Sequence, residues 1–131
     1  MTYSYQLYLE LESNYTRITI GHDPARTRKY TKLQISSLVY KSSSTSDNLG
    51  LIIQGWTNMY DIATGSEFTK IIPLLGVNTI NLYSEYENVM TCVLDSGLTL
   101  HQFDVRVLED GSPSANISPT NKLKLTLTFF E

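Results

Sequence analysis

Two histidines and one cysteine are the side chains of this sequence best suited to metal binding or nucleophilic chemistry. His22 and Asp23 lie together in a segment that contains glycine and proline, and they could supply half of a metal site. No His-x-His or Cys-x-x-Cys spacing supplies the remaining ligands, and His101 lies far along the chain. We therefore expect no metal and no other cofactor, and we interpret His22 as an exposed loop residue.

Covalent catalysis would need a serine, threonine or cysteine beside a base. The sequence contains no Gly-x-Ser-x-Gly elbow. Cys92 and His101 could be paired as a dyad, but Cys92 lies in an apolar segment, residues 90–94, whose pattern predicts a strand with the thiol in the core. A single cysteine forms no internal disulfide, so a buried thiol in a reducing cytoplasm is the simplest interpretation.

Paired carboxylates could hydrolyse a glycosidic bond, and jelly-roll proteins include such enzymes. Glu85 and Glu87 share one face of an expected strand, Asp104 is isolated, and Glu109 and Asp110 lie in a turn. This distribution is typical of solvated edges and turns rather than of two carboxylates that meet in a cleft. The sequence therefore predicts a protein that is not an enzyme.

The elements that must position these residues are strands. Apolar side chains occupy alternate positions, the period of a half-buried strand, in residues 3–11, 15–20, 33–40, 103–107 and 123–129. Residues 49–56 are apolar on both faces, which predicts a central strand. Further strands are expected at residues 68–75, 78–83 and 89–94, and Pro73 should lie at a sheet edge or end its strand. Residues 21–29 should form a loop, and a helical turn is expected only at 58–63 or 98–102.

This pattern predicts an all-β fold, a two-sheet sandwich or a barrel of about eight strands, in one domain over residues 1–131. The alternation slips at Ser36 and Ser37, which predicts a bulge. The last two strands, joined by the turn-rich residues 109–121, are expected to form a closing hairpin. The inward face of the final strand should carry Leu123, Leu125, Leu127 and Phe129.

The charge pattern favours a protein partner over nucleic acid. The net charge is −3, which argues against a surface that binds nucleic-acid phosphates throughout. No apolar run approaches the length of a membrane span. Basic residues gather at Arg26, Arg28 and Lys29, while acids dominate the last third of the chain, at Glu85, Glu87, Asp95, Asp104, Glu109, Asp110 and Glu131. This separation suits a head-to-tail ring of identical subunits. Ordinary solvated loops, and nucleic-acid contact by the basic segment, remain the alternatives.

Nine tyrosines suggest strand faces that meet a partner. Tyr3 and Tyr5 share one face of the first strand and Tyr8 lies on the other, so these three are expected at subunit or partner contacts. A second group, Trp56, Tyr60 and Tyr86, could instead form an aromatic platform for carbohydrate. The sequence therefore keeps a second function class open, a non-catalytic module that recognises carbohydrate or a surface receptor.

Three segments carry a resemblance to a known family: residues 68–74, residues 102–108 leading into Glu109-Asp110-Gly111, and residues 121–129. Together they resemble the small single jelly-roll capsid proteins, of penton or minor capsid type, of tailless icosahedral double-stranded DNA viruses. The resemblance implies a single jelly-roll-like β-sandwich of two antiparallel sheets. It also implies a structural virion protein that self-associates, with a pentameric ring favoured, and that contacts other capsid proteins. It carries over no catalytic residue.

Overall fold

The computed structural model describes residues 3–41, 48–63, 65–73, 80–84, 91–109 and 123–131. Within these ranges the chain is all-β, as predicted, and its one helix is a single turn. The elements are β1 (Ser4–Leu11), β2 (Tyr15–Thr19), α1 (Asp23–Arg26), β3 (Lys29–Lys41), β4 (Asn48–Ile53), β5 (Met59–Asp61), β6 (Ser66–Phe68), β7 (Lys70–Pro73), β8 (Ile80–Ser84), β9 (Thr91–Thr99), β10 (Gln102–Glu109) and β11 (Leu123–Phe130).

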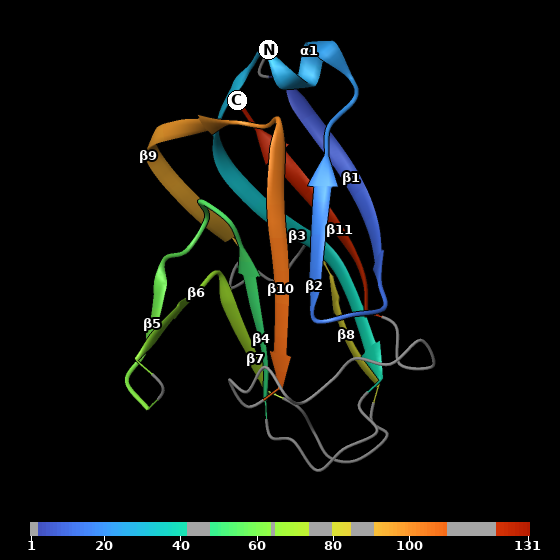
Figure 1. Ribbon diagram of the computed structural model, residues 1–131, viewed down its shortest axis with the longest axis vertical. Helices are drawn as coiled ribbons and strands as arrows, with labels where there is room; N and C mark the ends of the chain where they lie inside the picture. The colour runs from blue at the N-terminus through green and yellow to red at the C-terminus, as the bar shows by residue number, and fades with distance from the viewer. Residues whose placement is uncertain (1–2, 42–47, 64, 74–79, 85–90, 110–122) are drawn as a thin grey trace.

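Two antiparallel sheets form the sandwich, with sheet B in front of sheet A in Figure 1. Sheet A has the order β1-β11-β3-β8, with β9 paired to the other part of β3, and sheet B has the order β2-β10-β4-β7. The pairing is nested: β1 pairs with β11, β2 with β10, β3 with β8 and β9, and β4 with β7. The chain therefore follows one long hairpin rolled into two sheets, which is the jelly-roll topology.

The described chain has more strands than the predicted eight, for two reasons. The β5–β6 hairpin is inserted between β4 and β7 as a separate two-stranded sheet. In sheet A, one jelly-roll position is divided, because β8 pairs with β3 from Ser37 onward and β9 pairs with β3 up to Gln34. The expected strand at residues 68–75 is also interrupted, since buried Thr69 turns its hydroxyl to the Ile53 backbone N–H, 2.8 Å away.

The predicted closing hairpin is wrong, because β10 and β11 belong to different sheets. β10 pairs with β2 and β4 in sheet B, whereas β11 pairs with β1 and β3 in sheet A. Alternation of apolar residues shows which face of a strand is buried, but it does not identify the neighbouring strand. The joining residues 110–122 lie outside the described part of the chain.

The core between the sheets follows the predicted alternation. Leu123 and Leu125 of β11 are fully buried, while Lys124 between them in sequence is exposed, and Leu127 continues the buried face. The ring of Phe129 lies at the centre of an aromatic cluster, with centroid distances of 5.8–6.0 Å to the rings of Tyr30, Trp56 and Phe103. Tyr30 and Phe129 belong to sheet A and Phe103 belongs to sheet B, so this cluster joins the two layers.

The predicted bulge is confirmed at Ser36. Thr126 pairs with Ser37 and the next residue, Leu127, pairs with Ile35, which leaves Ser36 as the extra residue of β3. The Ser36 hydroxyl lies 2.7 Å from the Thr128 hydroxyl, so the unpaired residue still has a hydrogen-bond partner. The bulge lets both halves of β3 keep their apolar side chains toward the core.

The helical turn α1 lies in the segment expected to be a loop, and the expected turns at 58–63 and 98–102 are not helical. Pro24 lies in the first turn of α1, where its missing N–H costs nothing. Ala25 is fully buried, and the Tyr30 hydroxyl donates to the Ala25 carbonyl oxygen over 2.7 Å. This contact holds α1 over one end of the sandwich, beside both chain termini (Figure 1).

The edge of sheet B also matches a sequence prediction. β7 is the last strand of the described sheet, and it ends at Pro73, which has no N–H to donate to a further strand. β4 lies between β10 and β7, as expected for its apolar pattern. Among the described helical residues, none form a helix of the length and apolar character needed to cross a membrane.

Candidate functional site

Five of the residues predicted to contact a partner lie at the end of the sandwich that α1 covers. We call this surface the basic end and define it by Tyr3, Tyr5, Arg26, Arg28 and Lys29. Tyr3 precedes β1 and Tyr5 lies near its start, while Arg26 ends α1, Arg28 lies between α1 and β3, and Lys29 begins β3. Figure 1 shows α1 and the start of β1 at this end. The sixth predicted residue, Tyr8, is 58% exposed on the outer face of β1, where its hydroxyl donates to Glu10.

Arg28 ties the two chain termini together. Its guanidinium lies 4.1 Å from the centre of the Tyr3 ring and donates to the Glu131 carboxylate at 3.1 and 3.3 Å. The Glu131 backbone N–H in turn donates to the Tyr3 carbonyl oxygen over 3.0 Å. The charge of Arg28 is therefore matched within the chain.

Arg26 and Tyr5 bring the two histidines to the basic end. Arg26 pairs with Asp23 at 3.3 Å and lies 3.3 Å from the His101 Nε2 atom. Because a guanidinium only donates, the imidazole nitrogen is the acceptor in this contact. The His22 ring stacks on the Tyr5 ring, with centroids 6.1 Å apart.

Lys29 provides the unmatched charge of the basic end. Its side-chain stem crosses Gly97, where a β-carbon would lie 2.8 Å from the Lys29 Cγ atom and where φ is +70°. Lys29 is exposed, and within the described ranges it is in no ion pair. With Arg26 and Arg28 opposed by Asp23 and Glu131, the basic end keeps an excess of one positive charge.

A second surface lies on the outer face of sheet B. We call it the sheet B groove; it has a volume of about 470 Å³ and is lined by Tyr15, Ile52, Gln54, Gly55, Thr57, Asp104 and Arg106. β2, β4 and β10 supply most of these residues. The sequence predicted which residues face outward, but of this set it singled out only Asp104, as an isolated acid.

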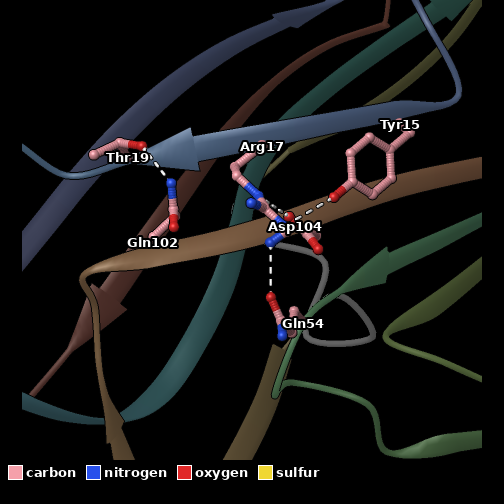
Figure 2. A network of polar contacts seen from close by, with 6 residues as sticks. All are labelled: Tyr15, Arg17, Thr19, Gln54, Gln102 and Asp104. Atoms are coloured by element: carbon pink, nitrogen blue, oxygen red, sulfur yellow. Dashed lines mark hydrogen bonds and ion pairs between the residues drawn. The ribbon is translucent and has the colours of Figure 1, made fainter.

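An ion pair between neighbouring strands forms one wall of the sheet B groove. The Arg17 Nε–H donates to Asp104 over 2.9 Å, and the same guanidinium donates to the Tyr15 hydroxyl over 3.3 Å (Figure 2). The hydrogen bond from Arg17 holds the pKa of Asp104 below its usual range, and the bond to Asp104 raises the pKa of Arg17. Asp104 is therefore a bound carboxylate rather than an acid poised to transfer a proton.

Gln54 and Gln102 extend the polar network on either side of this ion pair. The Gln54 side-chain oxygen accepts the Asp104 backbone N–H over 3.0 Å, and the Gln102 amide donates to the Thr19 hydroxyl over 3.2 Å (Figure 2). Arg106 lies two residues beyond Asp104, with its guanidinium 5.8 Å from the centre of the Tyr15 ring. The lining of the groove thus includes the Tyr15 ring, the Gln54 amide and the Arg106 guanidinium.

The three aromatic residues expected to bind carbohydrate do not form a common platform in the described structure. Trp56 is 1% exposed, because its ring packs against Phe129 in the core. Tyr60 is 62% exposed on the separate β5–β6 hairpin. Tyr86 lies outside the described residues. Trp56 was predicted to contact carbohydrate because it is aromatic, but aromatic side chains are found both in protein cores and on exposed binding surfaces.

The candidate nucleophile is buried, as the sequence predicted. Cys92 is 3% exposed, its thiol donates to the Trp56 carbonyl oxygen over 3.3 Å, and burial raises its pKa. His101 is exposed and contacts Arg26 at the basic end. Among the residues that the structure describes, no group of three or more histidine, cysteine or carboxylate side chains is arranged to hold a metal ion.

Comparison with known proteins identifies no family, because no protein-family model matches the chain and no curated protein matches its sequence significantly. The two surfaces and the fold are therefore the observations from which a function is inferred.

Proposed function

We propose that this protein is a structural subunit of a virion shell, of penton or minor capsid type, which acts by self-association and by contacts to other capsid proteins. The observation that carries the proposal is the nested strand pairing, in which each arm of a rolled hairpin pairs with its counterpart. This jelly-roll topology is common to viral capsid and lectin domains.

The charge distribution favours a head-to-tail contact between copies. At the start of β10, the Ile20 N–H donates to the His101 carbonyl oxygen, which places this end of the strand beside the basic end. β10 then runs for eight residues to Glu109, roughly 25 Å away at the rise of an extended strand. A subunit with excess positive charge at one end and an acidic residue, Glu109, at the other end of β10 suits heterologous assembly.

Three of the side chains with catalytic potential, all within the described residues, have structural partners in this fold. Cys92 is bonded to the Trp56 carbonyl oxygen, Asp104 to Arg17, and His101 to Arg26. Each contact ties together segments that are distant in sequence. These roles agree with a protein that works through shape and association, and we propose that it has no catalytic activity.

The contact at the basic end can be tested by charge reversal at its unmatched residue. In the Lys29→Glu variant, sedimentation velocity should show loss of the assembly formed by the wild-type chain, with the melting temperature unchanged. Lys124→Glu is the matched control, because Lys124 is an exposed lysine on β11. Raising the salt concentration should weaken the wild-type assembly in the same direction, because exposed charges are screened. Equal behaviour of the two variants would reject the basic end as the contact.

A further inference from the structure

The sheet B groove is lined by polar and aromatic side chains that the proposed shell function does not require. We propose that it binds an acidic sugar, a glycan residue that carries a carboxylate, on the outer face of sheet B. This site is distinct from the Trp56, Tyr60 and Tyr86 platform that the sequence suggested. Its lining combines residues of the strands β2, β10 and β4 with Gln54, Gly55 and Thr57, which follow β4.

Hydrogen-bond donors exceed acceptors in the groove. The Gln54 side-chain oxygen is occupied by the Asp104 backbone N–H, so the orientation of this amide leaves its two N–H donors for a ligand. Arg106 is exposed, and its guanidinium has five N–H donors. Its contact with the Tyr15 ring is a cation–π contact, which involves no hydrogen-bond acceptor. Thr57 adds a hydroxyl to the same lining. Such a set favours a ligand rich in oxygen acceptors.

The charge of the groove selects an anion. Asp104 lines the groove and is paired at 2.9 Å with Arg17 beside it, so Arg17, Asp104 and Arg106 together leave one positive charge at the groove. A planar guanidinium binds a carboxylate through two parallel hydrogen bonds, a geometry that a neutral sugar does not offer. Gln54 can then donate to a second oxygen of the same ligand. Charge complementarity therefore points to a carboxylate-bearing residue rather than to a neutral one.

The aromatic wall of the groove suits the C–H face of a pyranose ring. Tyr15 is 46% exposed, and the bond from Arg17 to its hydroxyl fixes the orientation of the ring. Ile52 adds an apolar surface to the lining. A volume of about 470 Å³ lies within the roughly 300–1,000 Å³ typical of small-ligand sites. Stacking on Tyr15 with ionic bonds at Arg106 would hold one acidic sugar residue in a defined orientation.

Saturation-transfer NMR and calorimetry with a glucuronic-acid-terminated disaccharide, and with its glucose-terminated counterpart, test this proposal. The wild-type protein should bind the acidic disaccharide at least about tenfold more tightly than the neutral one, the effect expected for one charge-assisted hydrogen-bonded pair. Arg106→Gln should abolish this preference, whereas Lys124→Gln, an exposed lysine on the other sheet, should preserve it. Tyr15→Phe should retain more affinity than Tyr15→Leu, because it keeps the ring.

Equal affinity for the two disaccharides, or wild-type affinity in a folded Arg106→Gln variant, would overturn the proposal. An acidic peptide that binds as tightly as the acidic disaccharide would also overturn it, because the groove would then recognise a protein carboxylate. If Arg106→Gln changes the assembly state and leaves sugar affinity unchanged, the groove is a subunit contact and the proposal fails. These readouts measure ligand affinity and are separate from the sedimentation test of self-association.

Discussion

Arg17 and Asp104 face each other across the β2–β10 pair, although 87 residues separate them in the sequence. Their 2.9 Å ion pair joins the second arm of the rolled hairpin to its counterpart in the second half of the chain. The same guanidinium holds the Tyr15 hydroxyl, and the Asp104 backbone holds Gln54. One cross-strand contact therefore serves the fold and positions the lining of the sheet B groove.

Replacing Asp104 with Asn should lower the melting temperature near neutral pH, and the difference from wild type should shrink in acid. The hydrogen bond from Arg17 lowers the pKa of Asp104 in the folded protein, so the ionised carboxylate favours folding above the ordinary aspartate pKa of about 3.9. This contribution is lost as the pH falls through the lower pKa of the folded state. Thermal scans of both proteins across this range measure the effect, and a difference independent of pH would contradict it.

Replacing Tyr30 with Phe should destabilise the protein by about 1–3 kcal/mol, because it leaves the buried Ala25 carbonyl without the hydroxyl that donates to it. Urea unfolding gives this value, and Tyr60→Phe on an exposed tyrosine is the matched control. Burial raises the pKa of Tyr30 to about 12, so its neutral form favours folding. That stability is present below the ordinary tyrosine pKa of about 10 and is lost as the pH rises toward the raised value. Equal losses in the two variants would show that the hydroxyl contact is unimportant.

The inward face of β11 should tolerate neither charge nor truncation. Leu127→Ala should cost about 2–5 kcal/mol through lost contacts and a cavity, since Leu127 is fully buried. Leu127→Asp and Leu125→Asp should prevent soluble folding, because each buries an unpaired charge. Lys124→Asp, on the exposed face of the same strand, should fold normally. A normal melting transition for either leucine-to-aspartate variant would show that the buried face is assigned wrongly.

Sequence periodicity predicted the parts of the fold that depend on one strand at a time. The inward residues of β1 and β11, the bulge at Ser36 and the terminating role of Pro73 all follow from side-chain alternation or from a missing backbone donor. Strand neighbours did not follow, because pairing across the chain depends on the packing of both sheets. For this reason β10 and β11 were expected as a hairpin, although they lie in opposite layers.

The candidate surfaces were predictable to different extents. Arg26, Arg28 and Lys29 are close in sequence, so local charge identified the basic end before the structure did. The sheet B groove brings together residues from β2, β4 and β10, and only cross-strand register places Tyr15, Gln54 and Arg106 on one lining. Trp56 shows the opposite case, since a lone tryptophan that suggested a ligand platform is a core residue.

The central claim, that this jelly roll is a self-associating shell subunit, is tested most directly by the molar mass of the wild-type chain in solution. Size-exclusion chromatography with light scattering, at micromolar concentration and without any partner protein, measures it. The account predicts a discrete multiple of the 14.8 kDa chain mass, five for a closed ring. A single species at the monomer mass across the whole concentration range would contradict the self-association on which the proposed function rests.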